Sequence, residues 1–281
     1  MARKDRDFWE SAKMNNATFM QHYNHLTELT LARYTWEGLP ETVDTRFLEL
    51  VLFGEGKALI FEDEGDLVCM RFTPNTSFDI YNKPKGRRAY AVNGYNRNFD
   101  ESNSVIVYNN LMRTPSKLDA EMFARRLYKI DRAMDINIDA QKTPIIISAD
   151  EDEYLTLKNL MEKYEGNIPF IYKRKSLNPQ ESIHALNTGA PFIAPHLQAL
   201  KSTVWNEALT HLGVSNVSIE KKERMIVDEI NRSQGGTIMS RESGLKARLA
   251  GANLINKMFG ERLGFECTVR YSDDERGVNI E

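Results

Sequence analysis

Residues 197–230 carry two successive helical patterns, and this stretch constrains the fold of the chain more than any other. In its first half, apolar residues recur every three or four positions, at Leu197, Leu200, Val204, Ala208 and Leu212. That spacing places them on one face of an α-helix. In its second half, charges of alternating sign follow at i, i+4 spacing on one face, with isoleucines on the opposite side. The stretch therefore predicts two consecutive amphipathic helices.

The second pattern leads into a polar stretch, residues 231–244, with the sequence NRSQGGTIMSRESG. Gly235, Gly236 and Gly244 lack the side chain that restricts backbone conformation. The stretch also shows no apolar face that could be buried. We expect a flexible loop here, because segments without a buried face move more than the elements they connect.

Elsewhere, the patterns predict an α+β protein in which helices predominate. Period-two alternation in KALIF (57–61) and DLVCMRF (66–72) indicates a β-hairpin. Thr114 and Pro115 are typical of a helix start, and the proline at position 144 disfavours helix before it, so a long helix is expected over 115–140. The other expected helices are at 19–36, after Asp44, at 153–164 and at 246–259, and the other strands are at 104–110, 145–148, 169–173 and 265–271.

The order of these elements predicts an elongated subunit. Long helices at 115–140 and 196–212 would enclose a small α/β insert as the arms of a hairpin enclose its tip. The flanking α+β regions would then pack together at the other end.

Composition and charge exclude several classes of protein. With 41% hydrophobic and 27% charged residues, the chain has the composition of a soluble globular protein. Its net charge of −3 argues against a protein that coats nucleic acid by bulk electrostatic attraction. No apolar run has the length of a membrane span, and the start MARKDRDFWES lacks the apolar core of a signal peptide. Cys69 and Cys267 form no CxxC motif, which favours a reducing compartment over a disulfide framework or a structural zinc site.

The sequence contains no motif that assigns catalytic residues. The segment GEGKA (54–58) lacks the first glycine of a phosphate-binding loop and the Ser or Thr after its lysine, and no GxSxG motif occurs. His22 and His25 stand at i, i+3 spacing without further ligand residues, so a place on a helix face is favoured over metal binding. We therefore predict no catalytic residue, no metal site and no cofactor.

An acidic run at residues 149–153 leaves one enzymatic alternative open. Asp150, Asp152 and Glu153 could hold a metal ion in a DNA-processing enzyme. Because a helix is expected directly after them, Asp150 and Asp152 serve better as capping acids at its N-terminus.

Sequence blocks distributed over nearly the whole chain resemble one protein family. They are MARK at the N-terminus, Trp36-Glu37-x-Leu39-Pro40, VIVYNN (105–110), AQKTPIII (140–147), YEGNIPFI (164–171), and VWNEALTHLG with IEKKERMIVDEI within 204–230. In their order and spacing these blocks resemble the head–tail connector, or portal protein, of small short-tailed phages with protein-primed linear DNA genomes.

The resemblance implies a phage portal fold of the α+β, mainly helical class. Portal subunits are long wedges that assemble into a dodecameric ring around a central DNA channel. By this resemblance, residues 1–12 form a basic N-terminal arm, 13–114 and 214–281 the α+β wing, 115–142 and 191–213 the stem helices, and 143–190 the small α/β clip. Residues 231–244 match the tunnel loop, which projects into the channel.

The resemblance also implies which residues face nucleic acid. Lys201 matches a channel lysine of the family, and the tunnel loop contains Arg232, Arg241, Gly235 and Gly236. The basic arm, which contacts packaging RNA in the relatives that have one, contains Arg3, Lys4 and Arg6. A basic patch in the clip, which would face nucleic acid, the tail or solvent, consists of Lys173, Arg174 and Lys175.

The implied function is a passive conduit for genome packaging and ejection that performs no catalysis. DNA has to slide, so contacts to phosphate should be weak, and ring symmetry multiplies each lysine into a ring of charge. The implied partners are further copies of the chain, double-stranded DNA, major capsid and scaffold proteins, a packaging ATPase, packaging RNA and the lower-collar tail protein, with no membrane. The expected locations are the virion and, during assembly, the host cytoplasm.

Two alternatives from other classes remain open at this point. One is the metal-dependent DNA-processing enzyme described above, which should cleave plasmid DNA. The other is a structural collar component that forms no ring at any concentration.

Overall fold

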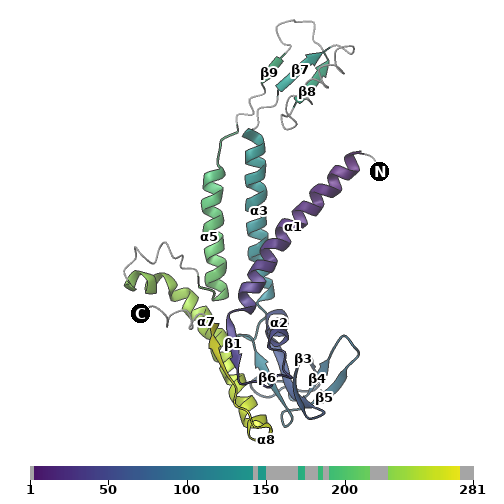
Figure 1. Ribbon diagram of the computed structural model, residues 1–281, viewed down its shortest axis with the longest axis vertical. Coiled ribbons are helices and arrows are strands. Elements are labelled where there is room, and N and C mark those ends of the chain that lie inside the picture. The colour runs from purple at the N-terminus through teal and green to yellow at the C-terminus, as the bar shows by residue number, and fades with distance from the viewer. Residues whose placement is uncertain are drawn as a thin grey trace. The chain divides into compact units, whose positions relative to one another are not determined.

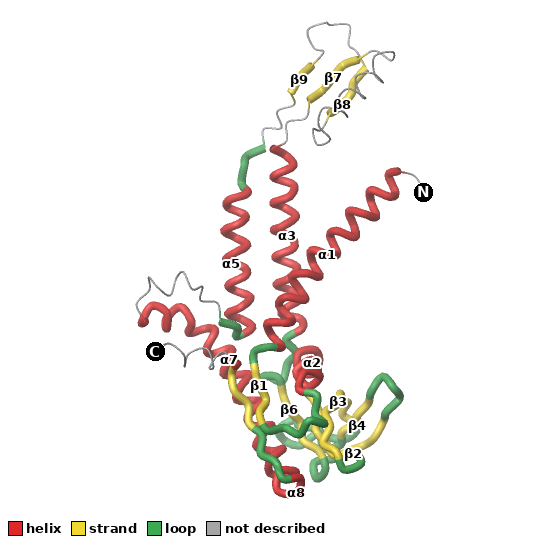
Figure 2. Tube along the Cα trace, in the orientation of Figure 1, coloured by secondary structure: helices red, strands yellow, loops and turns green. Residues whose placement is uncertain are grey.

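A computed structural model describes residues 3–141, 145–149, 170–174, 183–185, 190–215 and 227–272, and side chains at 14–141, 190–215 and 235–272. The chain divides into two compact units, one of residues 1–127 and 204–281 and the other of residues 128–203. Figures 1 and 2 show the elements of both units. Two long helices, α3 (Lys117–Gln141) and α5 (Ala194–Leu212), contribute residues to both.

The first unit combines helices with two antiparallel sheets. Its other helices are α1 (Arg3–Leu31), α2 (Thr45–Glu55), α7 (Val227–Ile255), a π-helical turn at Asn256–Gly260, and α8 (Glu261–Leu263). One sheet has the strand order β5-β4-β3-β2-β6, with β2 (Lys57–Asp63), β3 (Asp66–Pro74), β4 (Arg87–Tyr90), β5 (Asn96–Phe99) and β6 (Ser104–Tyr108). The other sheet pairs β1 (Tyr34–Glu37) with β10 (Thr268–Tyr271).

The strand β2 is apolar on both faces because each face covers a separate hydrophobic cluster. Leu59 and Phe61 point into one cluster, which β3, β4 and β6 complete. Ala58 and Ile60 point into the other, to which α2 and α7 contribute. The hairpin expected from KALIF and DLVCMRF is confirmed as β2 and β3. The continuous apolar run in β2 is thus the signature of a strand buried on both sides.

The start of α2 is also confirmed. Asp44 adopts an extended backbone conformation, and its carboxylate accepts a hydrogen bond from the N–H of Phe47 at 2.9 Å. An aspartate at this position satisfies one of the N–H groups that a helix leaves unpaired at its first turn. The helix then buries Leu48, Val51 and Leu52 against the sheet.

The helix predicted at 19–36 ends earlier in the structure than the sequence pattern indicated. The helix α1 ends at Leu31, and Trp36 lies in β1, where its indole N–H donates to Glu49 Oε1 at 2.9 Å. Tyr34 and Trp36 are both buried and alternate with less buried neighbours. Pairing with a strand more than two hundred residues away overrides the helical pattern here, because it buries two aromatic side chains that a continued helix would place on different faces.

The prediction of a flexible loop at 231–244 is wrong, because the whole stretch belongs to the helix α7. This part of α7 has a buried face, but small and polar residues form it. The buried positions recur at helical spacing into the apolar second half of α7 and are Thr237, Gly244, Ala247, Arg248, Gly251, Ala252 and Ile255. A search for apolar periodicity cannot find a face of that kind.

Two helix boundaries also differ from expectation. The helix α3 begins at Lys117, after Ser116, whose carbonyl accepts from the N–H of Ala120 at 3.1 Å. Thr114 is instead bound by the side chains of Asn109 and Asn110. The helix expected at 246–259 is the second half of α7, and it continues through a π-helical turn and α8 to Leu263.

In the second unit, β7 (Ile145–Ala149) lies between β8 (Phe170–Arg174) and β9 (Ile183–Ala185). It pairs parallel with β8 and antiparallel with β9. The strands expected at 145–148 and 169–173 are thus confirmed within one residue. The segment before α5 is tied to α3, because the amide of Asn137 donates to the carbonyl of Pro191 at 2.8 Å and accepts from the N–H of Ile193 at 3.0 Å. The helix expected at 153–164 lies outside the described residues, as does much of the second helix expected before residue 230.

Both cysteines are buried in the first unit, and this gives a prediction for alkaline pH. Burial raises the pKa of the Cys69 thiol to about 12 and that of the Cys267 thiol to about 11. In the unfolded chain both thiols ionise near their ordinary pKa of about 8.5. The unfolded state therefore binds fewer protons above that pH, so the stability contributed by the neutral thiols falls as pH rises from about 9 toward 11. We expect Cys69→Ala with Cys267→Ala to show a shallower fall of melting temperature between pH 9 and 10.5 than the wild type. Equal slopes would contradict this assignment.

Candidate functional site

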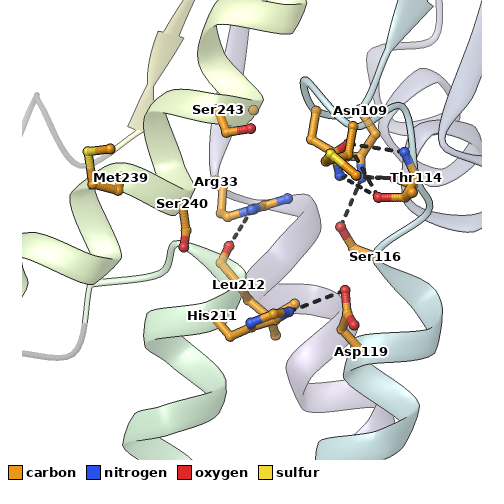
Figure 3. A pocket seen from close by; sticks show the side chains of 13 residues that line it. Arg33, Asn109, Thr114, Ser116, Asp119, His211, Leu212, Met239, Ser240 and Ser243 are labelled. Carbon is orange, nitrogen blue, oxygen red and sulfur yellow. Dashed lines mark hydrogen bonds and ion pairs between the residues drawn. The ribbon is translucent and has the colours of Figure 1, made fainter.

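A pocket of about 480 Å³ lies in the first unit, where four segments of the chain meet. Its walls come from Arg33 after α1, the segment between β6 and α3, the C-terminal end of α5, and residues 239–244 of α7 (Figure 3). This volume is in the range of pockets that bind small molecules.

The polar groups of the pocket come from each wall. His211 of α5 lies 3.4 Å from the carboxylate of Asp119 in the first turn of α3. The guanidinium of Arg33 donates to the carbonyl oxygens of Thr30, at 3.0 Å, and of Leu212. Figure 3 shows the contact between Arg33 and Leu212 and the pair of His211 and Asp119.

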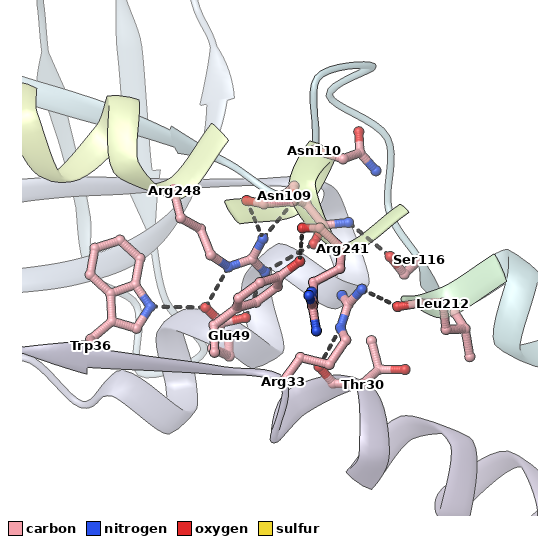
Figure 4. A network of polar contacts seen from close by, with 12 residues as sticks. Thr30, Arg33, Trp36, Glu49, Asn109, Asn110, Ser116, Leu212, Arg241 and Arg248 are labelled. Carbon is pink, nitrogen blue, oxygen red and sulfur yellow. Dashed lines mark hydrogen bonds and ion pairs between the residues drawn. The ribbon is translucent and has the colours of Figure 1, made fainter. Parts of the chain in front are cut away.

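A network of buried polar side chains lies behind the Arg33 wall (Figure 4). Its centre is Arg248, which is 1% exposed and forms two hydrogen bonds with the carboxylate of Glu49, at 2.8 and 2.6 Å. Arg248 also donates to the backbone carbonyl and the side-chain oxygen of Asn109, at 2.6 and 3.1 Å. The ring of Tyr34 contacts both guanidinium groups, with Arg248 Cζ 4.2 Å and Arg33 Cζ 5.1 Å from its centroid.

The two buried arginines differ in electrostatic environment. Burial lowers the pKa of the Arg33 guanidinium, and the charge of Arg248 adds to the effect. For Arg248 burial alone would also lower the pKa, but the carboxylate of Glu49 outweighs it and the pKa is raised. Arg248 is thus paired with an acid, whereas Arg33 relies on carbonyl oxygens.

The structure places Lys201, the expected channel lysine, in the second unit. Its ammonium group lies 2.6 Å from the carboxylate of Asp131 on α3, and both side chains are largely buried. The lysine is therefore half of an ion pair, which sequence periodicity did not indicate.

Three of the expected tunnel-loop residues lie in the part of α7 for which burial and contacts are described. Gly236 is exposed and Gly235 is partly exposed. Arg241 Cζ lies 4.2 Å from the ring centroid of Tyr271, and the carbonyl of Arg241 accepts from the Tyr34 hydroxyl at 2.7 Å. These contacts hold Arg241 against the β1–β10 sheet.

The remaining expected site residues have no described side chains. The backbones of Arg3, Lys4 and Arg6 belong to α1, that of Arg232 to α7, and those of Lys173 and Arg174 to β8. Lys175, and the alternative metal ligands Asp150, Asp152 and Glu153, lie outside the described residues. Where side chains are described, the ring of His25 contacts that of Trp205 in a tilted arrangement, with centroids 5.0 Å apart, in line with a place on a helix face.

Sequence reasoning missed Arg33, Glu49 and Arg248. A signal exists for two of them, because Glu49 interrupts the apolar run FLELVLF and Arg248 stands between Leu245 and Leu249. A charge within an apolar helical face is expensive unless it is paired, so such a position predicts a buried partner. Nothing local identifies that partner, since the two residues are 199 positions apart.

Two searches over the described residues gave negative results. Among the residues that the structure describes, no three His, Cys, Asp or Glu residues come close enough to hold a metal ion. None of the helices in those ranges is both long and apolar enough to cross a membrane.

Comparison with known proteins gives one family and several similar structures. The family model described as "Phage Connector (GP10)" matches residues 7–273. A chain in the structure of the portal and tail of native bacteriophage P68 is similar, with a TM-score of 0.52 and 14% identity over 100% of this chain and 99% of that one. An HK97 family phage portal protein from Corynebacterium diphtheriae gives a TM-score of 0.44 and 9% identity over 94% and 95% of the two chains.

Proposed function

The chain belongs to the phage connector (GP10) family and has the α+β phage portal fold, and we propose that its copies form a ring through which a phage genome passes. The observation that carries this proposal is the family match over residues 7–273. The ring would occupy one vertex of the capsid, admit DNA during packaging and release it at ejection. As a portal protein it is a virion component, and we propose that it assembles in the host cytoplasm and performs no catalysis.

We assign the segments of the subunit as the sequence predicted. Residues 115–142 and 191–213 form the stem, 143–190 the clip, 13–114 and 214–281 the wing, and 1–12 a basic arm. Residues 231–244 still face the channel in this assignment, with Arg232, Gly235, Gly236 and Arg241, but as part of a helix. The origin in a short-tailed phage with a protein-primed genome stays a prediction.

The proposed partners follow from this role. Arg3, Lys4 and Arg6 would contact packaging RNA, and Lys173, Arg174 and Lys175 of the clip would contact nucleic acid or the lower-collar tail protein. The wing would contact capsid and scaffold proteins, and a separate packaging ATPase would supply the energy.

Negative-stain electron microscopy, combined with the mass in solution, tests the ring. We expect annular particles with a central hole and a mass many times the 32.3 kDa of one chain. A single-chain mass at every concentration would favour the non-ring collar component. Cleavage of plasmid DNA by the pure protein with a divalent metal would favour the DNA-processing enzyme, and in either case the conduit proposal fails.

The Lys201–Asp131 pair gives a sharper prediction for the channel. An ion pair presents little net charge to DNA, which suits a conduit in which the duplex has to slide. Lys201→Gln should weaken binding of double-stranded DNA to the assembled ring and make its dependence on salt shallower. Asp131→Asn should do the opposite, because it leaves the lysine charge uncompensated in every subunit.

DNA binding to rings of the two variants, measured over a range of salt concentrations, checks this prediction. Both variants should assemble as the wild type does. If both bind DNA with the wild-type affinity and salt slope, Lys201 does not face the channel.

A further inference from the structure

The buried network around Arg248 has a net positive charge. It contains two guanidinium groups, those of Arg33 and Arg248, and one carboxylate, that of Glu49, which gives a net charge of +1. Glu49 is fully engaged by Arg248, with an additional hydrogen bond from Trp36. Among the described residues, no carboxylate forms an ion pair with Arg33, although that side chain is only 7% exposed. A buried charge in that situation is costly unless a counter-charge reaches it.

The pocket that Arg33 lines is a route by which a counter-charge can reach it. Two carbonyl oxygens hold the guanidinium in place, which leaves one of its terminal nitrogens without a hydrogen-bond partner among the described residues. Figure 3 shows the end of the Arg33 side chain facing the space between α7 and the start of α3. A pocket of about 480 Å³ has room for several side chains.

The rim of the pocket indicates what kind of group fills it. Met112 and Met239 line the pocket and are 79% and 71% exposed, respectively. Large exposed apolar side chains around a buried charge are typical of protein interfaces, where an apolar rim excludes water from a polar anchor. Methionine in particular adapts its shape to a protein partner. A hydrated free anion would gain nothing from such a rim.

We propose that a neighbouring copy of this chain inserts an acidic side chain into the pocket and pairs it with Arg33. This inference rests on the proposed ring, in which each subunit meets another copy through the same pair of surfaces. Charge complementarity supports the occupant, since Arg33 has no ion-pair partner among the described residues, and Asp119, the acid that lines the same pocket, lies 3.4 Å from His211. The chain as a whole has a net charge of −3. Every subunit of the ring would then complete the buried network of the next one.

Ser240 allows a test in which charge is the only variable. It lines the same pocket as Arg33 and lies in the middle of α7, where Asp and Asn have similar helix propensity and nearly the same shape. Ser240→Asp supplies a carboxylate from the subunit's own helix, whereas Ser240→Asn does not. Compared with Ser240→Asn, Ser240→Asp should raise the melting temperature of the isolated subunit. It should also weaken the ring, with about a tenfold higher protein concentration needed for half assembly, because the incoming carboxylate now meets a like charge.

The opposite signs of these two effects distinguish the proposal from a general disturbance of packing, which would lower both the melting temperature of the subunit and the stability of the ring. In an Arg33→Gln background the difference between the two Ser240 variants should vanish. If Arg33→Gln does not fold, the comparison of Ser240→Asp with Ser240→Asn still tests whether an acidic side chain of a neighbouring copy enters the pocket.

Three results would overturn the proposal. If the wild type forms rings and the two Ser240 variants assemble equally well, the interface does not use this pocket, while the ring itself stands. If inorganic phosphate stabilises the isolated wild-type subunit and the variants assemble equally, the pocket binds a free anion instead. If the wild type forms no ring, both this inference and the proposed function fail.

Discussion

Glu49→Gln should lower the free energy of unfolding of the isolated subunit by about 3–5 kcal/mol, the cost of breaking a buried ion pair. The glutamine amide keeps the shape of the carboxylate but not its charge. Arg248 and Arg33 would then remain as two buried cations, and no other carboxylate of the described residues forms an ion pair with either of them. Chemical denaturation at a protein concentration too low for assembly measures the effect.

The matched control for this prediction is Glu207→Gln. Glu207 lies 3.7 Å from Arg126, and both side chains are more than half exposed. An exposed pair of this kind gains little from its partner because water screens the charges. We expect this variant to unfold nearly as the wild type does. If Glu49→Gln costs no more than Glu207→Gln, the network is not the electrostatic centre of the first unit.

Gly244→Ala should destabilise the subunit strongly, by about 1–3 kcal/mol or more, as an overpacked core does. An added Cβ would lie 2.2 Å from the hydroxyl oxygen of Tyr34 and 3.3 Å from a terminal nitrogen of Arg248. Tyr34 is buried and its hydroxyl is bonded to the carbonyl of Arg241, so it has little freedom to move away. Denaturation of the isolated subunit again measures the loss.

Gly235→Ala is the control in the same helix, and its effect should have the opposite sign. A Cβ there meets nothing within 4 Å. Alanine in a helix is favoured over glycine by about 0.5–1 kcal/mol, because glycine loses more backbone freedom on folding. The pair therefore also tests the corrected assignment of residues 231–244. If that stretch were a flexible loop, both substitutions would leave the stability unchanged.

The elements defined by local patterns could be predicted from the sequence. The alternation in β2 and β3, the capping aspartate of α2 and the apolar stripe of α5 each lie within one stretch of the chain. Such signals reflect which faces of a strand or helix avoid water, so they survive without knowledge of the partner. The same holds for the sequence blocks that resemble the portal family, which the family match confirms.

The candidate site could not be predicted in the same way. Lys201 was expected from a resemblance, but its pairing with Asp131 depends on how α3 and α5 pack. The pocket brings together Arg33, Asn109, His211 and Ser240, which are far apart in the sequence. No local pattern marks Arg33, because its environment is made by a carbonyl at the end of α5 and by Glu49, whose carboxylate pairs with Arg248 and not with Arg33.

The sequence by itself determined the α+β class, the β2–β3 hairpin, the long helices α3 and α5, and the family, since these depend on periodicity, capping residues and extended blocks. Tertiary structure alone decided whether residues 34–37 become a strand and whether residues 231–244 become a helix. It also decided which buried arginine meets a carboxylate. The physical reason is the same in all three cases: the free energy that selects the conformation comes from burial against, or pairing with, a segment remote in the chain. Gly244 illustrates this best, because a residue that signals flexibility in isolation is required where the ring of Tyr34 leaves no room for a side chain.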